Sequence, residues 1–236
     1  MMYYSADGVK KIFTLDKQLF YGGCSGIYAL DDKLCLKKYF SYTSDKCRLD
    51  YDTYMILKEI NSHNTNNIRD LYYTDCLVQN VNLLMKNPNN FETDAYSFEF
   101  LEDNNKNIME CSTEYLLENM VALEQLIKIL TDYKVFMRDL KRSNTVYNGD
   151  NIVLIDPDCY KVNNKDSYRY ILKNNNCQLK NLFIDLFKNC NSYEEKYKCK
   201  VEELFSPSRK PNLSENVAKK LVKYKMPIDY IKDRGR

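Results

Sequence analysis

The hydrophobic pattern changes its period part-way along the chain, and this change constrains the fold more than any other feature. Short apolar runs with strand-like spacing occupy residues 13–20, 26–30 and 34–40, separated by turn-forming segments. After Cys111, apolar residues from Leu116 to Leu130 recur at the three- and four-residue spacing of one helical face. We therefore expect an α+β protein in which a small antiparallel β-sheet precedes a helical part.

The remaining elements of the first part are expected from the same two periods. The apolar positions of residues 45–60 fit one face of a helix, and residues 77–85 fit strands. An asparagine run at residues 64–67 indicates a loop between them. The first part thus resolves into a small β lobe with one helix.

The second part is expected to be mainly helical. Ser112 or Thr113 is suited to cap the long helix, because a hydroxyl there can accept a hydrogen bond from a free backbone N–H group. Residues 135–155 alternate apolar pieces with polar loops and contain the hairpin signal Asn148-Gly149. Further helices are expected over residues 179–187 and 217–224, and a loop at the asparagine run 174–176.

The charge balance and the single histidine exclude several classes of function. The 236 residues include 35 basic and 33 acidic side chains, a formal charge of +2, which argues against a protein that mainly coats nucleic acid. The basic stretches Lys219-Lys220 and 234–236 leave binding of nucleic acid or an acidic partner as a minor alternative. His63 is the only histidine, so sites that need two histidines are excluded.

Nothing in the sequence predicts secretion or a membrane partner. The nine cysteines are scattered without a C-x-x-C pair, which favours free thiols in a reducing cytosol. No secretory signal is visible at residues 1–11, and no run approaches the roughly 18 apolar residues of a membrane span. We expect a cytoplasmic protein.

One polar segment carries recognisable chemistry. Residues 137–144 read Met-Arg-Asp-Leu-Lys-Arg-Ser-Asn, and residues 153–156 read Val-Leu-Ile-Asp. The segment resembles the catalytic loop and metal-binding strand of the eukaryotic-like protein kinase family, whose pattern is H-R-D-L-K-x-x-N and then a strand ending in D-F-G. Asp139 and Asn144 keep the family's spacing of five positions (144 − 139).

This resemblance implies ATP and Mg²⁺ as cofactors and assigns a role to each polar residue. Asp139 would orient the attacking hydroxyl, and Lys141 would reach the transferring phosphate. Asn144 and Asp156 would supply oxygen ligands to Mg²⁺. Because phosphoryl transfer depends mainly on positioning and on neutralising negative charge, these residue types suit the reaction.

Upstream segments resemble the nucleotide-binding parts of the same family. Gly23 and Gly26 match the second and third glycines of the glycine-rich loop. Residues 34–37 resemble V-A-I-K, so Lys37 is expected to bind the phosphates, with Cys35 on the same face of the strand. Residues 83–86 resemble the strand that enters the adenine-binding hinge, with Met85 next to the adenine.

The sequence also departs from the family pattern. The helix glutamate that holds the strand lysine aligns with Thr53, so Asp50 or Asp52 is left as a candidate partner of Lys37. Met137 replaces the loop histidine. The D-F-G triplet becomes Asp156-Pro157-Asp158, in which Asp158 adds a second carboxylate near the metal. No A-P-E motif follows, and only a short polar stretch, residues 161–173, precedes the next apolar helix.

The resemblance implies a two-lobed protein-kinase-like fold, with a small β N-lobe over residues 1–86 and a reduced helical C-lobe over residues 87–236. The expected function is transfer of the γ-phosphoryl group of ATP to a hydroxyl, first of all Ser or Thr of a protein substrate. Two alternatives stay open. One is a small-molecule kinase similar to aminoglycoside or choline kinases, and the other is a pseudokinase that binds nucleotide or recruits a partner.

Overall fold

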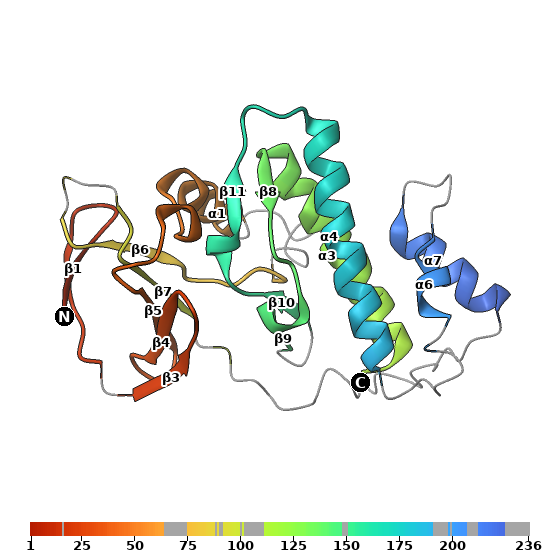
Figure 1. The fold of residues 1–236 in the computed structure, drawn as a ribbon, viewed down its shortest axis with the longest axis horizontal. Helices are drawn as coiled ribbons and strands as arrows, with labels where there is room; N and C mark the ends of the chain where they lie inside the picture. Colours follow the sequence, from red (N-terminus) through yellow and green to blue (C-terminus); the bar gives the residue numbers. More distant parts are fainter. Residues whose placement is uncertain are drawn as a thin grey trace.

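A computed structural model of the chain has a mixed α+β architecture, with a large sheet at one end of the long axis and helices at the other (Figure 1). The structure describes residues 1–15, 17–63, 75–87, 89, 92–99, 101, 111–147, 151–190, 198, 200–206 and 212–224. The expected loop at residues 64–67 and the Asn148-Gly149 turn lie outside these residues. No described helix is both long and apolar enough to cross a membrane.

Seven antiparallel strands form the large sheet, in the order β2-β1-β6-β7-β5-β4-β3. The three strand-like runs predicted to form a small antiparallel sheet are confirmed as a meander of β3 (Lys17–Tyr21), β4 (Ser25–Ala29) and β5 (Leu34–Tyr39). The other four strands are β1 (Met2–Ser5), β2 (Lys10–Ile12), β6 (Asn82–Met85) and β7 (Ala95–Glu99). The sheet therefore includes an N-terminal hairpin that the pattern did not predict, and it continues past the expected boundary at residue 86.

Strand β5 lies in the interior of the sheet, and its two faces have different neighbours. It pairs with β4 on one side and β7 on the other, with Lys37 opposite Tyr96. Leu36 points to the small cluster formed with Tyr3, Leu84 and Ala95. Because side chains alternate along a strand, Cys35 and Lys37 share the opposite face, as predicted. That face is turned toward the main core.

Helix α1 (Tyr51–His63) begins later than the predicted helix because Asp50 caps it. The carboxylate of Asp50 accepts a hydrogen bond from the backbone N–H of Thr53 at 2.8 Å, which is the usual geometry of a helix N-cap. A short 3₁₀ helix, η1 (Asp45–Cys47), precedes it. Leu57 and Ile60 are buried in the main core, as the helical pattern predicted.

Helices α3 (Thr113–Asp132) and α4 (Tyr168–Asn189) pack against each other and form the centre of the second part (Figure 1). Ser112 caps α3 as predicted, accepting from the N–H of Tyr115 at 3.2 Å. The helix predicted over residues 179–187 begins eleven residues earlier, at Tyr168, where Ser167 caps it. Two shorter helices, α6 (Val201–Leu204) and α7 (Leu213–Lys223), lie at the end of the molecule.

The asparagine run 174–176 is helical, so the loop expected there is wrong. Asn175 is fully buried in α4, and its amide donates to the carbonyl of Val135 at 2.9 Å and accepts from the N–H of Met137, also at 2.9 Å. A third bond reaches the hydroxyl of Thr131 at 3.0 Å. These partners come from other elements, so a local pattern of asparagines could not reveal them.

Two small strand pairs connect α3 to α4. Strand β8 (Val135–Met137) pairs with β11 (Tyr160–Val162), and β9 (Thr145–Tyr147) pairs with β10 (Ile152–Leu154). The strand predicted over residues 77–85 is limited to β6, while Leu77 makes only a bridge to Leu154. The main core includes residues from the large sheet, α1, both strand pairs and the C-terminal helices.

Candidate active site

The loop that follows β8 brings three of the predicted site residues together. Asp139 has φ of +55°, a left-handed conformation that is uncommon outside glycine and is often found at functional sites. Asn144 ends the short 3₁₀ helix η3 (Arg142–Asn144) and is buried. Its amide nitrogen donates to the backbone carbonyl of Asp139 at 2.8 Å. Asn144 therefore holds the loop closed around Asp139.

The carboxylate of Asp139 forms a short ion pair within this loop. Its Oδ2 atom lies 2.6 Å from Nζ of Lys141, and both side chains are about half exposed. The hydrogen bond that Lys141 donates to Asp139 raises the pKa of Lys141, so the ammonium stays charged. The loop thus presents a carboxylate and a cation together at the surface, where a reacting group can approach.

The predicted strand lysine meets the predicted metal aspartate across 119 residues of sequence. Nζ of Lys37 in β5 lies 2.6 Å from Oδ1 of Asp156, which follows β10. Asp156 also has a left-handed backbone, with φ of +64°. The next residues form the 3₁₀ helix η4 (Pro157–Cys159), and the left-handed turn directs the Asp156 and Asp158 carboxylates to the same ammonium.

Asp158 is the second partner of Lys37. Its carboxylate lies 3.1 Å from Nζ, and it accepts a further hydrogen bond from the hydroxyl of Tyr96 at 3.2 Å. The sequence indicated Asp158 as an additional carboxylate near a metal, but nothing in the local pattern pointed to Tyr96. Only the pairing of β5 with β7, which places Tyr96 opposite Lys37, brings these side chains together.

The two groups of residues are joined by direct contacts. The backbone carbonyl of Asn144 accepts from the N–H of Ile155 at 3.0 Å, immediately before Asp156. The amide of Asn144 also lies 4.0 Å from Sγ of Cys159. Ligand atoms of Asp156, Asp158 and Cys159 lie within 4.8 Å of one another. Lys37, Asp139, Lys141, Asn144 and Asp156 therefore belong to one contiguous polar site.

Burial shapes the electrostatics of this site. Burial by itself lowers the pKa of Lys37, but the carboxylates of Asp158 and Asp156 outweigh it, so the pKa of Lys37 is raised. Burial also raises the pKa of Asp158, against the opposing effect of Lys37. For Cys159, burial and the neighbouring carboxylates raise the pKa of the thiol to about 12. Lys37 is thus a fixed cation, whereas Cys159 is a neutral thiol.

The donor set fits a magnesium ion. Mg²⁺ prefers oxygen ligands and keeps several of its own waters, so one or two side-chain oxygens suffice. Asp156 is 28% exposed and contacts Lys37 through Oδ1. The amide nitrogen of Asn144 donates to Asp139, and among the described residues its oxygen accepts only a long hydrogen bond, 3.4 Å, from the hydroxyl of Ser143. The neutral thiol of Cys159 is a poor magnesium ligand.

The predicted glycines lie in the hairpin of β3 and β4, next to the strand that carries Lys37. Gly23 is in the turn between β3 and β4, with open space where a side chain would be. Gly26 is in β4, next to Ile27, which pairs directly with Lys37. A Cβ atom at Gly26 would approach the ring of Tyr28 to 3.0 Å, which is closer than ordinary contacts allow. The hairpin therefore lies directly beside the strand that carries the lysine, in the same sheet.

Met85 is not brought together with the other predicted site residues. It ends β6, which is separated from β5 by β7, so the two strands lie about 10 Å apart. Strand β6 leads into the connection to β7, and the chain leaves the sheet for the helices only after β7. By connectivity, the last strand of the sheet before the helices is therefore β7, and its Phe98 pairs with Cys35.

Helix α1 contacts the site through β11 and not through Lys37. The hydroxyl of Thr53 accepts from the N–H of Val162 at 3.2 Å, and Asp50 forms an ion pair with Lys161 at 3.1 Å. Asp52 is exposed. Among the described residues, the carboxylate partners of Lys37 are Asp156 and Asp158, so neither of the two candidates left open by the sequence, Asp50 and Asp52, pairs with it.

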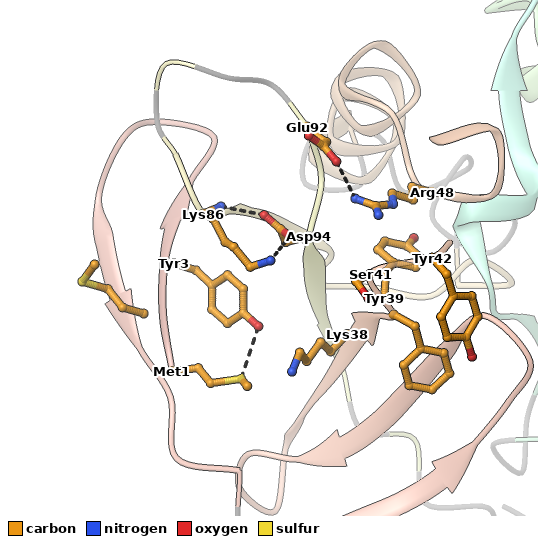
Figure 2. A pocket seen from close by; sticks show the side chains of 12 residues that line it. Met1, Tyr3, Lys38, Tyr39, Ser41, Tyr42, Arg48, Lys86, Glu92 and Asp94 are labelled. Atoms are coloured by element: carbon orange, nitrogen blue, oxygen red, sulfur yellow. Dashed lines mark hydrogen bonds and ion pairs between the residues drawn. The ribbon is translucent and has the colours of Figure 1, made fainter. Parts of the chain in front are cut away.

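A separate pocket of about 600 Å³ lies elsewhere on the sheet. Figure 2 shows Tyr3 and Lys38, from β1 and β5, pointing into it. Two of its cations are already paired, Lys86 with Asp94 at 2.8 Å and Arg48 with Glu92 at 3.0 Å. None of the predicted site residues lines this pocket, so it has no part in the candidate site.

Comparison with protein-family models and with curated protein sequences finds no match to this chain. The assignment of a function therefore depends on the geometry of the site.

Proposed function

We propose that this protein is an ATP- and Mg²⁺-dependent phosphotransferase with a two-lobed protein-kinase-like arrangement. The observation that carries the proposal is the contact between Lys37 and Asp156 beside the Asp139–Asn144 loop. These residues were selected from the sequence for one reaction, and they lie far apart along the chain. Their meeting in one place is what the proposed reaction requires.

Each residue has a defined task in the proposed reaction. Lys37 holds the phosphates of ATP, since a buried ammonium is a strong ligand for phosphate oxygens. Asp139 accepts the hydrogen bond of the acceptor hydroxyl and orients it toward the γ-phosphorus. Lys141, 2.6 Å from Asp139, balances charge on the transferred group. Asn144 and Asp156 would hold Mg²⁺, which bridges and neutralises the phosphates.

The architecture supports a division into two lobes with the site between them. Lys37 and the glycine hairpin come from the large sheet, whereas Asp139, Asn144 and Asp156 come from the loops between α3 and α4. Nucleotide would enter where Asp156 is partly exposed. In this proposal the adenine lies near Cys35 and Phe98, which face each other across β5 and β7.

Ser or Thr of a protein is the first acceptor class, because Lys141 follows Asp139 in the D-L-K form of the loop. A small-molecule hydroxyl is the second candidate, and a specific observation favours it. Only residues 163–167, five positions, separate β11 from α4. Such a short connection leaves little chain to form the platform on which protein kinases bind peptides.

A cytoplasmic location stays a prediction that the thiols support. The eight described cysteines are all free, and several of them are buried side chains of the core. Free buried thiols suit a reducing compartment. Neither membrane nor nucleic acid is needed as a partner in the proposed reaction.

Phosphoryl transfer from labelled ATP tests the proposal. The purified protein is incubated with Mg²⁺ and labelled ATP against a mixture of generic proteins and, separately, against sugars and amino alcohols. Transfer to proteins or to small molecules identifies the acceptor class. Asp139→Asn should lower transfer by about 10² or more, because it removes the carboxylate that orients the hydroxyl.

The matched control is Asp32→Asn, which changes an exposed carboxylate in the turn before β5 and should leave transfer unchanged. Nucleotide binding without transfer to any acceptor would instead support the pseudokinase alternative. Equal transfer by wild type and Asp139→Asn would rule out the assigned role of Asp139.

A further inference from the structure

Lys37 has two carboxylate partners with different surroundings. Asp156 lies 2.6 Å from Nζ, and its side chain is 28% exposed. Asp158 lies 3.1 Å from the same atom, and its side chain is only 8% exposed, as is that of Lys37. A metal ion arriving from solvent reaches Asp156 first, whereas Asp158 is enclosed with the lysine.

Asp158 is held in place by groups on both sides. The hydroxyl of Tyr96 donates to it at 3.2 Å, and Tyr96 is itself 1% exposed. Pro157 fixes the start of η4, which follows the left-handed turn at Asp156. Because two donors already occupy the Asp158 carboxylate, its position relative to Lys37 is set before any nucleotide binds.

Helix α1 does not supply a carboxylate to Lys37. Thr53, at the position where the resemblance expects a glutamate, uses its hydroxyl to accept from Val162. Asp50 pairs with Lys161 in β11. The described carboxylates near the start of α1 are therefore directed to β11 or to solvent, and the anchoring charge for Lys37 comes from the other side of the site.

We infer that Asp158 is the positioning residue for Lys37, in place of a carboxylate from helix α1. The inference deepens the proposed function and depends on it. Asp156 can then turn to a magnesium ion while Asp158 keeps the ammonium paired and directed at the phosphates. Because both carboxylates belong to one turn, the lysine is aligned without any movement of α1.

A double-mutant cycle tests this role. Asp158→Asn keeps the shape of the side chain but removes its charge, and we expect kcat/KM for ATP to fall about tenfold or more. Lys37→Met should lower it at least as much. If Asp158 acts through Lys37, kcat/KM of the double variant should lie within about threefold of that of Lys37→Met alone, because Asp158 has already lost its lysine partner in Lys37→Met.

Asp50→Asn is the matched control, because asparagine still caps α1 and Lys37 keeps both carboxylates. It should leave kcat/KM within about twofold of wild type and combine multiplicatively with Lys37→Met. The Mg²⁺ concentration for half-maximal rate should be unchanged in Asp158→Asn. Multiplicative losses together with a higher Mg²⁺ requirement would show that Asp158 is a metal ligand and would overturn the inference.

A second measurement does not depend on activity. Without nucleotide, the shifts in urea midpoint caused by Lys37→Met and Asp158→Asn should be clearly less than additive, whereas those of Lys37→Met and Asp50→Asn should add. Additive shifts for the first pair refute the contact itself. A wild-type protein that transfers no phosphate refutes the proposed function and this role together, whereas an active wild type with independent effects refutes the role of Asp158 alone.

Discussion

Replacing Asn175 by alanine should destabilise the protein strongly, although its neighbour Asn174 is the same residue type in the same helix. Asn175 is fully buried and satisfies two backbone groups of β8, the N–H of Met137 and the carbonyl of Val135. An unsatisfied buried backbone group costs about 1–3 kcal/mol, so the two together cost about 2–6 kcal/mol. The better helix propensity of alanine returns about 0.5 kcal/mol of this.

The net loss of about 1.5–5.5 kcal/mol corresponds to a fall in Tm of roughly 3–22 °C for a chain of this size. Urea unfolding followed by circular dichroism measures the change, with Asn174→Ala as control. Among the described residues, the amide of Asn174 bonds only to the carbonyl of Tyr170 in its own helix, at 2.9 Å, so its replacement should be neutral or slightly stabilising.

The same variant should also affect the site, because β8 leads directly into the loop of Asp139. We expect a lower kcat for phosphoryl transfer in folded Asn175→Ala, whereas Asn174→Ala keeps the wild-type rate. Equal urea midpoints for the two variants would show that the buried amide does not hold β8, and the reasoning about this support would be wrong.

Three further perturbations have definite expected outcomes. Asp156→Ala should weaken binding of Mg²⁺-ATP, so the thermal stabilisation by Mg²⁺-ATP should largely disappear; an unchanged titration would contradict the metal role of Asp156. Thr53→Val keeps the shape of a buried side chain but removes the acceptor for the N–H of Val162, so the free energy of unfolding measured in urea should fall by about 1–3 kcal/mol. An unaltered urea midpoint would show that this hydrogen bond does not stabilise the protein. Burial and the neighbouring carboxylates raise the pKa of Cys159 to about 12, so a fraction of only about 10⁻⁴ of this thiol is thiolate at pH 8, and the fraction rises tenfold per pH unit up to that pKa. Mass spectrometry after iodoacetamide treatment should therefore find Cys159 alkylated far more slowly than the exposed Cys177, and comparable rates would contradict the burial of the thiol.

The sequence by itself determined the elements whose signal is local. The β3–β4–β5 meander follows from alternation and turn residues, and α3 follows from its apolar spacing and the Ser112 cap. The resemblance of residues 137–144 to the kinase catalytic loop also selected two residues, Asp139 and Asn144, that the structure joins by a hydrogen bond. In each case the residues that decide the structure lie within a few positions of one another.

The tertiary structure alone decided which distant groups meet. Lys37 is paired with Asp158 and not with the start of α1, since the register of β5 with β7 and the left-handed turn at Asp156 place the carboxylate there. Met85 lies apart from Lys37 for the same kind of reason, because the sheet places β7 between β6 and β5. Asn175 became a buried support because α4 packs on β8. The physical reason is that a buried polar group is placed by its partners, and those partners are brought by packing from parts of the chain that no local pattern connects.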